Sequence, residues 1–329
     1  MSSRPRLGSA PLLFALAALL LPALGSGAAL AGYPDRIVKI VVPFAPGGGT
    51  DVIARTLAQE MARDLGVSVI IENKPGAGTI IGTQAVAASE PDGYTLLMGT
   101  FSHAVNLSLN PKLPYDPHKD FAPVALIARS FNFVVVNPKS PIKSIADLIA
   151  AAKAEPEKLS YGTYGTGTSA HLAGELFKNM AGVNLTTVPY KGAAPAITDL
   201  IGGQIQVMFT TVASAASLIE AGQLRALAVT SVERSPAFPQ LPTVAEAGVP
   251  GYAAESWYGL FAPAKTPADI IDRLNKSAAV AVQSEVFKKL GVNEGLAVVA
   301  RPPAELDRYV RGEEERWRKV IEEAGIKIE

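Results

Sequence analysis

The chain has 329 residues, with 30 Lys and Arg against 30 Asp and Glu, three His and no Cys. Because the two signs balance and are interspersed, the composition argues against a nucleic-acid-binding surface or a polybasic membrane-binding surface. The lack of cysteine excludes disulfides, thiol nucleophiles and thiolate metal sites.

Residues 1–31 have the pattern of a cleaved secretory signal. Arg4 and Arg6 precede an apolar run from Pro11 to Leu24, and Ala29-Leu30-Ala31 supplies the small-x-small pattern before a cleavage site. The apolar run is too short for a membrane span. Cleavage would leave 329 − 31 = 298 residues, with 30 − 2 = 28 basic and 30 acidic side chains. A chain of this size is expected to form two lobes, and the signal predicts that it is soluble outside the inner membrane.

The remaining chain begins with a strand expected at Ile37–Val42, followed by the glycine-rich stretch Pro43–Asp51. A helix with Ile53, Leu57, Met61 and Leu65 on one face follows, and Thr50 or Asp51 is predicted to cap it. Free N–H groups at a helix start attract an anion, and glycine lets the ligand approach the backbone. Two interpretations stay open here, an anion site and a tight turn without a ligand.

Strands and helices alternate along the next two hundred or so residues, which predicts sheets covered by helices on both faces. The strands are expected at Val67–Ile71, Tyr94–Met98, Val124–Ala128, Phe133–Val136, Val188–Tyr190, Ile205–Phe209 and Leu224–Thr230. The helices between them are expected at Ile80–Ala88, Ile145–Ala154, Ala196–Ile201 and Ala213–Ala221, with a further one after Ser169.

A second glycine-bearing turn, Gly162–Ser169, precedes a helix and carries the hydroxyls of Thr163, Thr166, Thr168 and Ser169. These hydroxyls are either ordinary turn and cap residues or a cluster that wraps a carboxylate in neutral hydrogen bonds. His171 either packs against its own helix start or reaches the same anion site. Ligands of such folds bind where strand ends meet helix starts, so helix starts from both halves are expected to share one cleft.

The last part of the chain is predicted to be helical. Thr266-Pro267 is expected to start a helix that runs to Gln283. A long last helix has Leu306, Tyr309, Val310, Trp317, Val320 and Ile321 on its apolar face, and Glu313, Glu314, Glu315, Arg316 and Arg318 on a face expected to be solvated. Trp257 and Tyr258 either line the cleft or fill the core, with core favoured for Trp257.

Enzyme motifs are missing from the sequence. The first glycine loop lacks the lysine of a phosphate-binding loop, and neither glycine turn completes G-x-G-x-x-G. No G-x-S-x-G or H-E-x-x-H occurs, and His103, His118 and His171 are far apart in sequence. We therefore expect no catalytic residues, no metal site and no cofactor.

Many separated motifs together resemble one family, the tripartite tricarboxylate transporter substrate-binding receptors, also called Bug receptors. The motifs are Tyr33-Pro34, Pro43–Gly48 with Asp51 and Arg55, Glu72–Gly78, Pro91–Leu96, Leu113–Pro117, Val188–Gly192 and Leu224–Thr230. They span the whole chain after the signal segment.

The resemblance implies an α/β periplasmic binding protein-like (type II) Venus flytrap, with two lobes that each hold a mainly parallel sheet flanked by helices. Lobe one would be residues 33–130 plus 253–329, and lobe two residues 131–252, with closure about crossover strands near 128–133 and 250–257. The ligand-binding residues carried over are Phe44, Ala45, Pro46, Gly47, Gly48, Ala77 and Gly78 from lobe one, and Thr163, Thr166, Gly167, Thr168, His171 and Thr210 from lobe two.

The resemblance also implies a monomer that binds a small carboxylate and delivers it to a two-component membrane permease. Thr79 stands where the family often has glycine, and Thr210 and Thr211 follow a strand after which many members carry Asp. Loss of that acid favours organic or aromatic carboxylates over amino acids. Two alternatives stay open: a receptor that signals to a membrane sensor kinase, and an enzyme on the same scaffold, which the sparse histidines disfavour.

Overall fold

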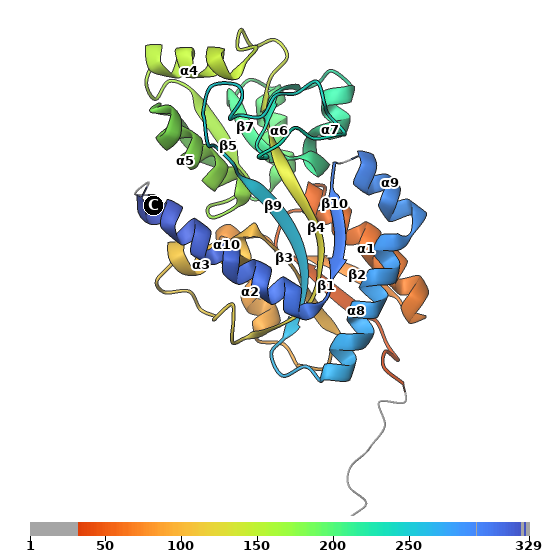
Figure 1. The fold of residues 1–329 in the computed structure, drawn as a ribbon. Coiled ribbons are helices and arrows are strands. Elements are labelled where there is room, and N and C mark those ends of the chain that lie inside the picture. The colour runs from red at the N-terminus through yellow and green to blue at the C-terminus, as the bar shows by residue number, and fades with distance from the viewer. Residues whose placement is uncertain (1–31, 294, 324–325, 327–329) are drawn as a thin grey trace, which may run out of the picture. The chain divides into compact units, whose positions relative to one another are not determined.

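The computed structural model describes residues 32–293, 295–323 and 326 (Figure 1). The predicted signal, residues 1–31, lies outside the described residues. The chain from Pro34 onward forms one unit. No helix within the described ranges combines the length and the apolar character that crossing a membrane requires.

Ten strands pair in the order β2-β1-β3-β9-β4-β7-β5-β6, with β8 and β10 also paired to β4. The lobe-one sheet contains β1 (Val38–Val42), β2 (Val69–Asn73), β3 (Thr95–Thr100), β9 (Glu255–Pro263), β10 (Ala297–Arg301) and the first part of β4 (Phe121–Val136). The lobe-two sheet contains the last part of β4 with β5 (Ser160–Thr163), β6 (Thr186–Pro189), β7 (Val207–Thr211) and β8 (Arg225–Val229).

Both sheets are mixed rather than mainly parallel. Strands β1, β2 and β3 pair in parallel, as do β5, β6 and β7, but every pairing of β4 and β9 is antiparallel. The sequence pattern missed this because antiparallel partners arrive here from distant parts of the chain.

Strand β4 is continuous, whereas two separate strands are predicted for it from the sequence. From Phe121 to Phe131 it pairs with β9, and from Asn132 to Val136 it pairs with β7. The polar Ser130 and Asn132 interrupt the apolar pattern, but both are buried, so the polarity marks the passage between sheets and not a loop.

Helices cover the faces of these sheets (Figure 1). In lobe one they are α1 (Gly49–Leu65), α2 (Ile80–Ala87), α3 (Phe101–Leu109), α8 (Ala268–Gln283), α9 (Glu285–Asn293), α10 (Pro303–Glu323) and the short η1 (Ala77–Thr79). In lobe two they are α4 (Ile145–Ala154), α5 (Ser169–Ala181), α6 (Ala193–Ile201) and α7 (Val212–Glu220). Helix α1 packs beside α8, and α10 packs beside α3.

The core confirms the assignment of Trp257, which is fully buried and lies edge-on to Tyr309 of α10. Trp317 of α10 is also fully buried and meets Phe101 of α3 at 4.9 Å between ring centroids. These aromatic contacts fasten the last helix to the lobe-one sheet.

Three local predictions are wrong. Helix α1 is capped by Gly48 and not by Thr50 or Asp51, and α8 begins at Ala268 with Pro267 at its cap. Glu313 is not solvated: it is buried and accepts a hydrogen bond from Trp317 Nε1 at 3.3 Å. Its position one turn before the indole makes the inward orientation possible, because residues four apart share a helix face.

Candidate functional site

The first glycine-rich loop is held in place by the carboxylate of Asp51. Its Oδ2 accepts the backbone N–H of Gly47 at 3.0 Å and Arg55 Nε at 2.9 Å, and its Oδ1 accepts Asn73 Nδ2 at 2.9 Å. Asn73 Nδ2 also donates to the carbonyl of Phe44 at 3.1 Å. The loop is therefore fixed from one side by a buried acid and from the other by a strand end.

The pKa of Asp51 lies below its ordinary value of 3.8. Burial is the largest single influence and raises it, but the hydrogen bonds from Arg55, Gly47 and Asn73 and the positive charge of Arg55 together outweigh burial. Asp51 is thus an anion that already has its partners, and it organises the loop.

Helix α1 presents uncapped N–H groups next to this loop. Its cap residue, Gly48, makes no side-chain cap bond, and although Gly49 N–H donates to Ser214 Oγ, within the described residues the N–H groups of Gly48, Thr50 and Asp51 have no hydrogen-bond acceptor. The cap positions of α6 and α7 are Gly192 and Thr211, and neither makes a side-chain hydrogen bond to the first turn of its helix. Unsatisfied N–H groups at a helix start carry partial positive charge, so each of these three starts can accept an anion or a dipole.

One small cavity lies where these three helix starts meet. Its volume is about 10 Å³, which is near the minimum that holds one water molecule. It is lined by Phe44, Gly48, Gly49, Thr50, Tyr164, Ala193, Thr211 and Ser214. The lining has no charged side chain, so any anion here would be held by backbone dipoles and hydroxyls.

Direct hydrogen bonds join the two lobes beside the cavity. Ala45 N–H donates to the Lys191 carbonyl at 3.2 Å, and Gly49 N–H donates to Ser214 Oγ at 2.9 Å. Ser214 Oγ in turn lies 2.9 Å from Thr211 Oγ1. A ligand larger than a water molecule can enter only if these contacts separate, because they close the walls around it.

A second place where the lobes touch depends on glycine. A Cβ built on Gly78 (φ +60°) would lie 2.3 Å from the Thr166 carbonyl oxygen, and one built on Gly167 (φ +75°) would lie 2.7 Å from Asn106 Oδ1. Both distances are shorter than real Cβ contacts. Side chains at these positions would hold the lobes apart.

The polar groups of the second glycine-bearing turn bond mainly to one another. Thr168 Oγ1 donates to the Gly165 carbonyl at 2.7 Å and accepts the N–H of His171 at 3.4 Å, which caps α5. His171 Nδ1 accepts the N–H of Gly167 at 3.2 Å. Burial lowers the pKa of His171 below 6.5, so the imidazole is neutral and able to accept this bond.

The structure brings part of the predicted site together. Phe44 and Gly48 line the cavity, and Ala45, Pro46 and Gly47 belong to the same loop. Ala77 and Gly78 belong to η1, where Gly78 faces Thr166 and Gly165, whereas Gly167 lies against Asn106. Thr163 Oγ1 accepts the Gly165 N–H at 3.2 Å, while Thr210 is fully buried and its hydroxyl has no partner among the described residues. Contact of these residues with a ligand stays a prediction.

Sequence analysis missed the lobe-two wall of the cavity. Tyr164, Ala193, Thr211 and Ser214 line it, and none was a predicted ligand residue. A usable signal existed, because Ala193 begins α6 after strand β6, while Thr211 ends β7 and Ser214 lies in the first turn of α7. The predicted ligand residues come from glycine-rich and hydroxyl-bearing turns, and this repeated position at strand ends was not among the criteria.

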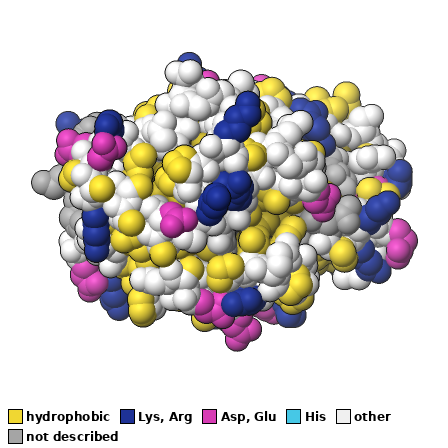
Figure 2. All heavy atoms as spheres, turned by 90° about the horizontal axis from the view of Figure 1, so that it is seen from above, with side chains coloured by type: hydrophobic (Ala, Val, Ile, Leu, Met, Phe, Trp, Pro, Cys, Tyr) yellow, Lys and Arg dark blue, Asp and Glu magenta, His cyan; other side chains and the backbone are white. Residues whose placement is uncertain are grey.

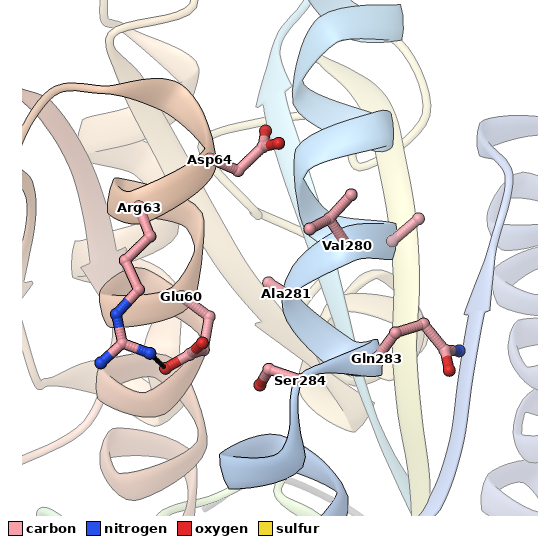
Figure 3. A pocket seen from close by; sticks show the side chains of 8 residues that line it. Glu60, Arg63, Asp64, Val280, Ala281, Gln283 and Ser284 are labelled. Carbon is pink, nitrogen blue, oxygen red and sulfur yellow. Dashed lines mark hydrogen bonds and ion pairs between the residues drawn. The ribbon is translucent and has the colours of Figure 1, made fainter.

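A larger hollow lies elsewhere, between α1 and α8. Its volume is about 690 Å³, and Glu60, Arg63, Asp64, Val280, Gln283 and Ser284 surround it (Figure 3). The dashed line in Figure 3 is the 2.5 Å ion pair from Arg63 to Glu60. The acidic side chains of this groove already have partners, because Glu60 pairs with Arg63 and Asp64 pairs with Arg273 at 2.6 Å. This open groove lacks the convergent unpaired donors of the smaller cavity.

On the face drawn in Figure 2, the surface charges are of mixed sign. Figure 2 shows Lys and Arg side chains interspersed with Asp and Glu and with apolar side chains on the face drawn. Within residues 32–293, 295–323 and 326, no group of three or more His, Cys, Asp or Glu could hold a metal ion. The small cavity is therefore the best candidate for a ligand site.

Comparison with known proteins places the chain in a family. Residues 53–326 match the tripartite tricarboxylate transporter family receptor. Protein BugT of Bordetella pertussis is 39% identical over 298 residues, covering 90% of this chain and 91% of BugT. The chain belongs to this receptor family, which is a family of solute-binding receptors and not of enzymes.

Two solved structures extend the likeness to the fold. R. palustris Rpa4515 with adipate is 41% identical with a TM-score of 0.87, covering 90% of this chain and 99% of that one. MatC (Rpa3494) from Rhodopseudomonas palustris with bound malate is 34% identical with a TM-score of 0.85, covering 88% and 100%. The fold is that of a two-lobed periplasmic binding protein.

Proposed function

We propose that this protein captures a small organic carboxylate between its two lobes in the periplasm and delivers it to a tripartite tricarboxylate-type membrane permease. The observation that carries the proposal is the convergence of three uncapped helix starts, α1, α6 and α7, on one cavity without charged side chains. The adipate and malate bound to Rpa4515 and MatC support a carboxylate ligand.

The chemistry of recognition rests on neutral donors. A carboxylate at the α1 start would accept the N–H groups of Gly48 and Thr50, and each such charge-assisted bond is worth about 1.5–3 kcal/mol. Thr211 and Ser214 would add hydroxyl donors from the other wall. Because closure removes water from the site, these dipoles act in a lower dielectric and bind the anion more strongly than in solvent.

The lobes are proposed to be residues 33–130 plus 253–329 and residues 131–252. The switch of β4 from β9 to β7 between Phe131 and Asn132 supports a hinge at that point. Closure would form the contacts of Ala45 with Lys191 and of Gly49 with Ser214, so a ligand that bridges the walls favours the closed state. The remaining predicted residues, from Ala77 to Thr210, would form the rest of the ligand surface.

No catalytic step is proposed, because the cavity lining offers no base, nucleophile or metal ligand beyond hydroxyls without an activating partner. The protein would act by binding and release alone. Turnover of a bound acid by the purified protein would contradict this.

The test uses two variants of Thr50, the second residue of α1. Thr50→Pro removes one unpaired N–H in the first helical turn, where proline is tolerated, whereas Thr50→Ala keeps the N–H and removes only the hydroxyl. Calorimetry with adipate, malate and a neutral sugar should show carboxylate binding to the unchanged protein. Thr50→Pro should bind at least about tenfold more weakly than Thr50→Ala, the equivalent of about 1.4 kcal/mol.

Binding of the sugar but of no acid would refute the anion assignment. Equal carboxylate affinities of the proline and alanine variants would move the site away from α1. Circular dichroism melts of both variants separate loss of binding from loss of folding.

A further inference from the structure

Tyr164 is a buried aromatic residue at the junction of the lobes. It follows β5, and its ring meets Phe44 of the other lobe edge-on, with centroids 6.1 Å apart. The residue is 8% exposed and lines the candidate cavity. Its phenol therefore takes up space between the α1 start and the α5 start.

The hydroxyl of Tyr164 lies at the first turn of α5. It is 2.7 Å from Ser169 Oγ, and the backbone N–H of Ala170, the next residue of α5, acts to lower the pKa of the phenol. Ser169 Oγ lies 3.4 Å from Asn132 Oδ1. Since an amide oxygen can only accept, the consistent direction runs from the phenol to Ser169 and from Ser169 to Asn132.

Asn132 supplies a second, independent sign of a binding position. It is fully buried at the passage of β4 between the sheets, and its Nδ2 has no hydrogen-bond partner within the described residues. Its side chain points to the α5 start, because Oδ1 lies against Ser169. An unpaired buried amide costs free energy, so a donor kept there indicates an acceptor that arrives with a ligand.

The α5 corner thus holds three groups able to donate to a ligand: the Ala170 N–H and the Ser169 hydroxyl beside the phenol, and the unpaired Asn132 amide, which adjoins Ser169. Burial raises the pKa of Tyr164 well above its ordinary value, so the phenol stays neutral. The neutral phenol donates to Ser169 and leaves Asn132 Nδ2 unsatisfied. A carboxylate, with two oxygens, could accept from all three.

We propose that Tyr164 determines ligand length, because its phenol occupies a carboxylate-binding corner at the start of α5. The inference rests on the proposed function, with the first carboxylate held at the α1 start. In the unchanged protein the ring ends the site, so short acids bind best. Without the ring, a longer dicarboxylate can place its second carboxylate at Ala170, Ser169 and Asn132.

The experiment measures calorimetric affinities of the purified protein for succinate, glutarate, adipate, pimelate and hexanoate. The unchanged protein should bind adipate at least about tenfold more weakly than succinate, since the ring blocks the longer chain. Tyr164→Ala should move the best ligand to adipate or pimelate. Hexanoate is the control for volume, because it has the length of adipate without the second carboxylate.

Tyr164→Ala should raise adipate affinity at least about tenfold more than hexanoate affinity. Tyr164→Phe keeps the ring and should leave the chain-length order unchanged. Equal gains for adipate and hexanoate, or an unchanged length order in Tyr164→Ala, would overturn the proposal. Tighter binding of adipate than of succinate by the unchanged protein would overturn it without any variant.

Failure of the proposed function looks different from failure of this inference. If no acid in the series binds to the unchanged protein or to either variant, the carboxylate receptor itself is refuted. If acids bind but Tyr164→Ala does not change which chain length binds best, only the proposed role of Tyr164 is refuted.

Discussion

The backbone N–H of Gly47 donates a 3.0 Å hydrogen bond to Oδ2 of Asp51, four residues further along the chain. Gly47 has φ +85°, a left-handed conformation that glycine adopts without strain. The bond turns the loop back over the α1 start, and the N–H groups of Gly48 and Thr50 have no acceptor in the part of the chain that the structure describes. Asp51, whose carboxylate already has its hydrogen-bond donors, thereby holds the loop in a conformation that can bind a second anion.

Asp51→Asn should therefore loosen the loop. An amide cannot accept from Gly47, Arg55 and Asn73 at once, because one of its two ends is a donor. We expect a loss of about 1–3 kcal/mol in the free energy of unfolding and about tenfold weaker carboxylate binding. Urea unfolding and calorimetry measure the two effects, and Asp307→Asn, at an exposed pair with Arg311, serves as the control.

The difference in free energy of unfolding between Asp51→Asn and the unchanged protein should depend on pH in a defined direction. Because the folded protein lowers the pKa of Asp51 below 3.8, the carboxylate contributes stability above that pH and loses it as pH falls through the lowered value. The gap between Asp51→Asn and the unchanged protein should shrink from about pH 7 to about pH 2. A gap that widened on acidification would contradict the assignment.

Gly78→Ala should weaken ligand binding in addition to lowering the free energy of unfolding. The new methyl would meet the Thr166 carbonyl of the other lobe at 2.3 Å, so the lobes could not close fully. Gly66→Ala is a matched control, since Gly66 also has positive φ (+74°) but has nothing within 4 Å of its Cβ position. Both variants should lose about 1–2 kcal/mol to backbone strain.

Only Gly78→Ala should also lose at least about tenfold in carboxylate affinity. Calorimetry and thermal unfolding of the two proteins give the comparison. Unchanged affinity in Gly78→Ala would mean that ligand binding does not require the contact between η1 and Thr166.

Glu313→Gln should stabilise the protein near neutral pH. Burial is the largest influence on Glu313 and raises its pKa above 4.5, so the charged form is disfavoured in the folded state. Glutamine removes the buried charge and can still accept from Trp317 Nε1. The gain should be present above the raised pKa and should disappear as pH falls below about 4.5, where the acid is neutral in both states.

Urea unfolding at several pH values measures this difference. The control is Glu315→Gln, at an exposed acid whose pKa is lowered by hydrogen bonds from Arg318 and Lys319. That variant should not gain stability. A loss of stability in Glu313→Gln at neutral pH would show that the charge contributes more through Arg316 than burial costs.

Trp317→Ala should destabilise the fold by about 3–5 kcal/mol, the usual cost of emptying a large buried aromatic site. The indole is fully buried against Phe101 and fastens α10 to α3. Val280→Ala, at an exposed position of α8, is the control and should change stability little. An effect of Trp317→Ala below about 1 kcal/mol would mean that α10 docks through other contacts.

Much of the fold could be predicted from local pattern. The strand, glycine turn and helix predicted at Ile37–Leu65 are confirmed, as are the helices predicted at Ile80–Ala88, observed at Ile80–Ala87, and at Ile145–Ala154, because apolar period and turn residues are local properties. Helix α3 was missed, since its start at Phe101 is a run of mostly buried residues without an amphipathic period. The single long β4 was split by Ser130 and Asn132, whose burial depends on strands far away in sequence.

The sequence by itself determined the family, the two-lobed α/β plan and the loop from Phe44 to Gly48 as one wall of the site. The family rests on many separated sequence motifs. The plan and the loop rest on apolar periods and glycine positions, which are local properties of the chain. The tertiary structure alone decided that α6 and α7 supply the opposite helix starts and that Tyr164 meets Phe44 of the first loop. These depend on distances between residues more than a hundred positions apart, such as Gly49 and Ser214, which only chain folding brings within hydrogen-bond reach.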